Sequence, residues 1–377
     1  MAGHGVISAD SHVTEPADLW EQRLDRRLRD RAPRVIENPG AGPRWLFAAE
    51  GATPFPLAGS FAAGRSGQAL KEVFDQGYEA ARPSGWDPVL RIEDQELDGV
   101  DAEVLYPSLG MTLFAMPDAA LQRACFHAYN DWLSEYCRHA PSRLYGIGLI
   151  SLEDLGTVEA DLERIAGQGM RGAMIWGAPP SDRPYSDRAY DLFWASAAEK
   201  GLPVSLHIIA GRGKTSNRVT EVTSGGSVDP GVWYMTVLHE IQESLARIVF
   251  GGVLVRHPRL QIVSAENDTG WIPHFMYRMD HVFEKYRAMW PDPLPEPPSV
   301  YVRRQLWATF QDDPIGPLTH EVFGADNYMW ASDFPHADST FPESRTWIAK
   351  NFAGVPEAVK RRIVFENAAS LYGMRPA

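Results

Sequence analysis

The sequence predicts an α/β protein, a (β/α)8 TIM barrel with a small cap-like insertion after its first strand. About eight short runs rich in Val, Ile and Leu alternate with longer segments of helical period, as βα units around a parallel sheet do. No glycine-rich phosphate loop follows the first run. That absence favours the barrel over an open doubly wound sheet, although alternation alone does not separate the two folds.

Eight strands are expected along the chain. Their predicted ranges are 6–9, 102–106, 144–150, 172–176, 203–207, 260–264, 306–310 and 328–332. Between the third and fourth strands, Val158, Leu162 and Ile165 recur at helical spacing. Cys125 and Cys137 share another helical stretch, where twelve positions separate them by about 18 Å. They are therefore too far apart to form a disulfide with each other, as is consistent with a reducing compartment.

The chain is interpreted as one large domain, residues 1–377, although length and composition alone make two domains as likely; composition also excludes several classes of protein. The 377 residues are 44% hydrophobic and carry a formal charge of -13, so we expect no binding to nucleic acid. No apolar run approaches the roughly 18 residues of a membrane span. The N-terminus lacks the basic and apolar regions of a signal peptide. A cytoplasmic protein without membrane contact is expected.

Two segments interrupt the βα pattern. Residues 33–92 are rich in Pro and Gly and too long for a simple connection, so we expect a small cap over the barrel mouth. Residues 211–231 are polar throughout and are a candidate mobile lid, with an ordinary surface loop as the alternative.

Side chains able to bind a metal ion follow four of the predicted strands. They are Asp10 and His12 after the first strand, His207 at the end of the fifth, Glu266 after the sixth and Asp333 after the eighth. The carboxyl ends of barrel strands meet at one mouth, so we expect these groups to lie together. Asp10 and His12 are two residues apart, which places both side chains on one side of an extended chain. Imidazole with carboxylate suits Zn²⁺, Mn²⁺ or Fe²⁺, and the pattern predicts a catalytic metal site.

Each of these residues also has an ordinary structural explanation. Asp10 and Asp333 are of a type that caps helices or forms turns. His207 is of a type that often lies hydrogen-bonded in a core. For Glu266 the alternative is to cap, or pair with, the helix expected near Trp271. The metal site is favoured because four strands place such residues at the same end.

Several motifs together carry a resemblance to a known family. They are Asp10-Ser11-His12, Trp86-Asp87-Pro88, Leu202-Pro203-Val204-Ser205-Leu206-His207, Trp330-Ala331-Ser332-Asp333-Phe334-Pro335-His336 and Glu366-Asn367-Ala368. In order and spacing they resemble the amidohydrolase superfamily, and more closely its amidohydrolase 2 branch, which includes aminocarboxymuconate-semialdehyde decarboxylase. The resemblance covers nearly the whole chain. It implies that Asp10, His12, His207 and Asp333 hold a divalent metal ion, and that Asp333 also handles the proton of a metal-bound water.

One position departs from the decarboxylases of that branch. Where they place a histidine after strand six, this chain has Glu266. A carboxyl group is a poorer proton donor to an aromatic carbon than an imidazolium unless burial raises its pKa. The departure favours a hydrolase in which activated water attacks the ester, thioester, amide or lactone carbonyl of a largely apolar acyl substrate, with Asp333 and Glu266 as catalytic groups.

Two other functions remain open. One is a metal-dependent non-oxidative decarboxylase or hydratase of an aromatic or unsaturated carboxylic acid. The other is a metal-binding barrel without turnover, which predicts the loss of a strand-end ligand, whereas all of them are present.

The sequence favours a single zinc ion. Binuclear members of the superfamily place a lysine or glutamate at the end of strand four, and residues 172–176 contain neither. A site with two ions is the alternative if Glu266 is an additional ligand. A ligand set rich in carboxylates would then suit iron or manganese better than zinc.

Substrate contacts are expected from residues at or after the strand ends. They are Tyr106, Trp176, Trp271, Arg212 with its neighbour Lys214 in the lid, and His336. The alternatives are core packing for the aromatic side chains and simple solvation for the basic ones. The expected partner is a small-molecule substrate, and the resemblance implies a homodimer.

Overall fold

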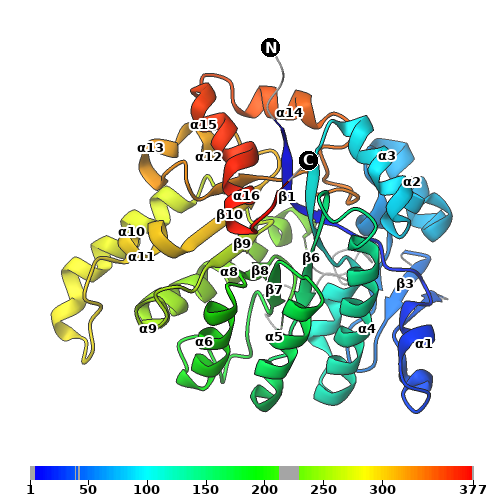
Figure 1. The fold of residues 1–377 in the computed structure, drawn as a ribbon, viewed down its shortest axis with the longest axis horizontal. Helices are drawn as coiled ribbons and strands as arrows, with labels where there is room; N and C mark the ends of the chain where they lie inside the picture. Colours follow the sequence, from blue (N-terminus) through cyan, green and yellow to red (C-terminus); the bar gives the residue numbers. More distant parts are fainter. Residues whose placement is uncertain (1–4, 39, 41–42, 212–228, 376–377) are drawn as a thin grey trace.

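In the computed structural model, which describes residues 5–38, 40, 43–211 and 229–375, eight parallel strands form the predicted TIM barrel (Figure 1). The strands are β1 (Ile7–His12), β5 (Ala102–Tyr106), β6 (Leu144–Leu149), β7 (Gly172–Ile175), β8 (Val204–His207), β9 (Ile262–Ala265), β10 (Leu306–Phe310) and β11 (Tyr328–Trp330). Each of the first seven pairs in parallel with the next barrel strand along the chain. The prediction of a barrel rather than an open sheet is confirmed.

The first and last strands meet at a seam that closes the barrel. The Asp333 backbone N–H donates to the Asp10 carbonyl at 3.0 Å, and the His12 N–H donates to the Phe334 carbonyl at 2.6 Å. The first strand was predicted to end at residue 9, but it continues to His12, which pairs with Tyr106 of β5. Asp10 and His12 therefore lie within the strand, and all six of its residues are buried.

Helices surround the barrel strands (Figure 1). They are α1 (Leu19–Arg23), α2 (Gly67–Gln76), α3 (Pro88–Asp98), α4 (Ala119–Cys137), α5 (Val158–Gly167), α6 (Asp191–Lys200), α8 (Pro230–Phe250), α9 (Val253–Arg256), α10 (Ile272–Tyr286), α11 (Pro298–Gln305), α12 (Ile315–Leu318), α13 (His320–Phe323), α14 (Ser344–Asn351), α15 (Glu357–Arg361) and α16 (Asn367–Leu371). Helices α10 and α11 pack together and extend from the body of the molecule (yellow).

Local sequence explains where these elements begin and how closely they pack. Helix α3 begins after Asp87, whose carboxylate accepts the N–H groups of Val89 and Leu90. In β6, a side chain at Gly148 would place a Cβ atom 2.9 Å from Ile165 of α5. A glycine at this position therefore lets α5 lie directly against the strand.

The insertion after β1 contains a small antiparallel sheet. Its strands are β2 (Arg34–Glu37), β3 (Trp45–Ala48) and β4 (Phe55–Pro56). Backbone hydrogen bonds from Ala63 to Pro335 and from Ala337 to Gly59 join the insertion to the loop that follows β11. The role of residues 33–92 as a cap stays a prediction. Most of the predicted lid, including Arg212 and Lys214, lies outside the described residues.

Two further expectations concern the cysteines and the membrane. Cys125 and Cys137 both lie on α4 and are free, as predicted. Within the described ranges, every helix is too short or too polar for a bilayer crossing.

Candidate metal centre

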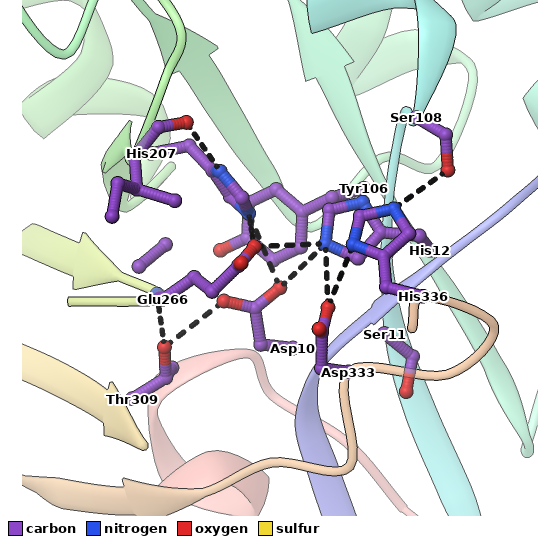
Figure 2. Close-up of polar contacts among 12 residues, drawn as sticks. Asp10, Ser11, His12, Tyr106, Ser108, His207, Glu266, Thr309, Asp333 and His336 are labelled. Carbon is purple, nitrogen blue, oxygen red and sulfur yellow. Dashed lines mark hydrogen bonds and ion pairs between the residues drawn. The ribbon is translucent and has the colours of Figure 1, made fainter. Parts of the chain in front are cut away.

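Five side chains from four strand ends converge at the mouth of the barrel (Figure 2). Asp10 and His12 lie on β1 and His207 ends β8, while Glu266 follows β9 and Asp333 follows β11. The structure thus brings together all five residues that the sequence predicts as metal ligands.

Their donor atoms lie within a narrow range of separations. The Nε2 atom of His12 is 3.5 Å from Asp10 Oδ1, 3.6 Å from Glu266 Oε2 and 3.4 Å from Asp333 Oδ1. The Nε2 atom of His207 is 3.5 Å from Asp10 Oδ1 and 3.4 Å from Glu266 Oε2. Donors that bind one ion at about 2.1 Å stand roughly 3–4 Å from one another. The spacing fits a shared ion.

The hydrogen bonds of the two histidines engage Nδ1 of each ring and leave Nε2 directed at the centre. His12 Nδ1 is 2.7 Å from the Pro107 carbonyl, and His207 Nδ1 is 3.1 Å from the Ile208 carbonyl. A carbonyl only accepts, so each Nδ1 carries a hydrogen, and Nε2 is the nitrogen that faces the centre and can bind a metal ion.

Several polar atoms at this centre are buried without a hydrogen-bond partner. They are Asp10 Oδ1, His12 Nε2, His207 Nε2 and both carboxylate oxygens of Asp333. Unsatisfied buried polar atoms cost about 1–3 kcal/mol each, and a bound cation would satisfy all of these at once. The residues therefore fit a divalent metal ion.

Electrostatics at the centre favours the same conclusion. Burial raises the pKa values of Glu266 and Asp333 well above the usual range, and repulsion between the two carboxylates raises that of Glu266 further. Burial lowers the pKa of His207, but the carboxylates of Asp10 and Glu266 outweigh it and raise the value to about 9. Two buried carboxylates and the partly exposed one of Glu266 thus compete for positive charge that a divalent ion would supply.

Strained backbone marks the strand ends that carry these ligands. In the described part of the chain, the non-glycine residues with positive φ are Ile209 (66°), Glu266 (55°), Asp268 (54°) and Asp333 (57°). They follow β8, β9 and β11. A left-handed conformation costs roughly 1–2 kcal/mol per residue, and such strain concentrates at functional sites.

His336, which was predicted as a substrate contact, lies beside the candidate ligands. Its Nδ1 atom is 3.0 Å from Asp333 Oδ1, and its ring stacks on that of His12 with centroids 3.8 Å apart. The Ser108 hydroxyl donates to the Val13 carbonyl and has no second hydrogen, so it accepts from His336 Nε2 at 2.9 Å.

The three aromatic residues predicted as substrate contacts are hydrogen-bonded within the protein. Tyr106 is fully buried between His12 and His207, with its hydroxyl 2.8 Å from that of Ser205. The indole N–H of Trp176 donates to the Phe114 carbonyl at 3.2 Å, and that of Trp271 to the Asn267 carbonyl at 2.7 Å.

A cavity of about 330 Å³ opens beside Glu266. One wall is apolar and comes largely from α8; it includes Trp233, Met235, Val237, Leu238 and Ile209. The lining also includes the acidic residues Asp268, Asp312 and Asp338. A pocket that joins an apolar wall to a metal centre suits a flat hydrocarbon or aromatic group with one polar end.

Sequence reasoning missed three residues that contact the candidate ligands or the neighbouring His336. Arg91 donates to the His12 carbonyl at 2.8 Å, Ser108 contacts His336, and Thr309 contacts Asp10 and Glu266. Thr309 lies near the end of a predicted strand, the one signal that could have identified it.

Comparisons with known proteins agree with this architecture. The family model described as "Amidohydrolase" matches residues 16–374. A gamma-resorcylate decarboxylase from Polaromonas sp. (strain JS666 / ATCC BAA-500) is 22% identical over 277 residues, covering 68% of this chain and 79% of that protein.

Solved structures share the fold over the whole chain. An amidohydrolase from Mycobacterium avium subsp. paratuberculosis K-10 superimposes with a TM-score of 0.79 at 22% identity, covering 99% of this chain and 100% of the other. A dihydroxybenzoic acid decarboxylase from Polaromonas sp. JS666, solved with manganese and the inhibitor 2-nitroresorcinol, gives 0.68 at 16% identity, with 100% and 98% covered.

Proposed function

Because the chain belongs to the amidohydrolase family, we propose that it is a Mn²⁺-dependent decarboxylase of an aromatic or unsaturated carboxylic acid. The observation that carries the proposal is the convergence of donor atoms from five residues, four of them buried and Glu266 partly exposed, beside a cavity with an apolar wall. The relatives add support, since those with named activities are decarboxylases and one contains manganese. They favour decarboxylation over the hydrolysis expected from the sequence, and manganese over zinc.

The ligand set is proposed as Asp10, His12, His207, Glu266 and Asp333 around one ion. Three carboxylates and two imidazoles are donors that suit Mn²⁺. When bound, the ion supplies positive charge that holds the substrate carboxylate and draws electron density from the adjoining carbon.

The residues of the chain supply the proton. Decarboxylation without oxidation adds a proton to the carbon that bears the carboxylate, and the electrons of the broken C–C bond stay with that carbon as CO₂ leaves. Asp333 and Glu266 carry carboxyl groups beside the site, so they are placed to pass on this proton. His336 lies 3.0 Å from Asp333 and keeps an imidazole beside it. The apolar wall along α8 would receive the ring or unsaturated chain.

Hydrolysis is the second candidate, and Glu266 is the observation that favours it. Its Oε2 atom is 3.4 Å from His207 Nε2 and borders the cavity, where a carboxylate can take a proton from an attacking water.

A product assay on the purified protein decides between the two reactions. Metal-free protein loaded with Mn²⁺ would be offered a panel of hydroxybenzoic and unsaturated carboxylic acids, and in parallel aryl esters and thioesters. We expect CO₂ in amounts equal to the acid consumed. An acid released from an ester, with no CO₂ from any carboxylic acid, would establish the hydrolase instead.

Asp333→Asn should lower the rate about 10²–10⁴-fold, because it removes both a ligand and a proton carrier. The matched control is Asp326→Asn, which changes an exposed aspartate paired with Arg362 and should leave the rate unchanged.

A further inference from the structure

Thr309, on β10, contacts two of the five proposed ligands at once. Its hydroxyl donates to Asp10 Oδ2 at 2.9 Å and accepts the backbone N–H of Glu266 at 2.8 Å (Figure 2). The residue is fully buried. A hydroxyl has a single hydrogen, so its one donor position is committed to Asp10.

We propose that Thr309 is a positioning residue that sets the metal-binding geometry of Asp10 and Glu266 together. The inference rests on the proposed function, because it takes both residues as ligands. It adds a coupling between them, since one hydroxyl on a third strand orients a side chain of β1 and the backbone after β9.

The first effect concerns which oxygen of Asp10 faces the ion. Thr309 occupies Oδ2, which leaves Oδ1 without a hydrogen-bond partner, 3.5 Å from both His12 Nε2 and His207 Nε2. The carboxylate is thus arranged to bind through one oxygen. Without the hydroxyl, Oδ2 would lose its partner and the carboxylate would be free to rotate.

The second effect concerns the backbone of Glu266. Its φ of 55° is a left-handed conformation that a residue with a side chain rarely adopts. The hydrogen bond to Thr309 holds the N–H of this strained residue, and the Asn267 amide holds the preceding carbonyl, that of Ala265, at 2.6 Å. The strained turn directs Glu266 Oε2 toward the two histidines instead of along the strand.

The test compares Mn²⁺ binding by metal-free wild type, Thr309→Val and Thr309→Ser, measured by calorimetric titration. Valine keeps the shape and removes the hydroxyl, whereas serine keeps the hydroxyl. We expect Thr309→Val to bind Mn²⁺ about 10–100-fold more weakly and Thr309→Ser to stay within about threefold of wild type.

Thr340→Val is the control for simple loss of a buried hydroxyl. Thr340 is buried, and its hydroxyl is 2.7 Å from that of Ser344, which is not a proposed ligand. This variant should bind Mn²⁺ as wild type does. Should Thr309→Val fail to fold, Thr309→Ala serves in its place.

A double-mutant cycle adds a readout that a general packing defect would not change. In a Glu266→Gln background, Thr309→Val should weaken Mn²⁺ binding by a smaller factor than in wild type, because part of its effect passes through Glu266. Equal factors in both backgrounds would overturn the coupling.

The remaining outcomes separate the two proposals. Wild-type affinity in Thr309→Val, or an equal loss in Thr309→Ser, overturns the role of the hydroxyl while leaving the metal site intact. A wild type that binds Mn²⁺ but releases no CO₂ overturns the decarboxylase alone. A wild type that binds no Mn²⁺ overturns both.

Discussion

Arg91 contacts the backbone of a proposed ligand, His12, and is not itself a proposed ligand. Its guanidinium forms two hydrogen bonds to Glu103, at 2.6 and 2.9 Å, and a third at 2.8 Å to the His12 carbonyl. Arg91 and Glu103 are both almost fully buried. The pair thus fixes β1 against α3 and β5 where a ligand departs from the strand.

Arg91→Met should lower the free energy of unfolding by about 3–5 kcal/mol, because it leaves the Glu103 carboxylate buried without its cation. Arg23→Met is the matched control, since Arg23 pairs with Glu135 at the surface and should cost about 1 kcal/mol or less. Denaturant titration measures both. Equal losses of unfolding free energy in the two variants would show that burial does not make the Arg91–Glu103 pair more important for stability than a surface pair.

Glu15 should make stability depend on pH. Burial raises its pKa from 4.5 to about 7, although the N–H groups of Gly110 and Leu109 lower it in part. Between these values the folded state keeps a proton that the unfolded chain releases, so this group makes the protein less stable as pH rises from 4.5 to 7.

The Glu15→Gln variant isolates that contribution. From pH 4.5 to 7, the unfolding free energy of wild type should fall relative to the variant by at most about 3 kcal/mol, and the difference should stay constant above that window. Denaturant titrations at several pH values measure it. A difference that is flat across the window would mean that Glu15 titrates normally.

At the scale of elements, the end of β7 controls the end of β8. A Cβ atom at Gly177 would lie against the His207 carbonyl, 2.7 Å from Ile241 and 2.9 Å from the Ala210 carbonyl. Gly177→Ala should therefore displace the strand end that carries His207, cost about 1–3 kcal/mol and weaken Mn²⁺ binding.

Gly167→Ala is its control. Gly167 ends α5 with no neighbouring atom within 4 Å of an added Cβ, so alanine should be neutral or stabilise by up to about 1 kcal/mol. Thermal midpoints and Mn²⁺ titrations distinguish the pair. A Gly177→Ala variant that binds Mn²⁺ like wild type would show that β8 does not depend on this close approach.

The element scale also shows what could be predicted from the sequence. Apolar runs located all eight strands, because parallel strands buried on both faces must be continuously apolar. The extension of β1 through Asp10 and His12 was not predicted, since buried polar residues do not resemble a strand. Residue types at strand ends identified the five residues that converge at the mouth of the barrel. Thr309 and Ser108 were missed because a hydroxyl acts through neighbours that only the fold provides.

At the scale of the whole molecule, a metal ion at the centre would tie four strands together. Its ligands lie on or just after β1, β8, β9 and β11. Removing Mn²⁺ with a chelator should lower the thermal midpoint, and adding it back should restore it. Binding to the folded state alone adds about 4 kcal/mol at a thousandfold excess over Kd. A midpoint that does not respond to Mn²⁺ would contradict the ligand assignment.

The homodimer stays a prediction.

The seam between β1 and β11 has a consequence for folding during translation. The hydroxyls of Ser11 and Ser332 meet at 3.0 Å although 321 positions separate them. During translation the first strand leaves the ribosome with an open edge, and its partner is synthesised almost last. Asp10 and His12 are therefore synthesised long before Asp333, and the site cannot form until translation is nearly complete. A chain released early would expose the edge of β1 that carries Asp10 and His12.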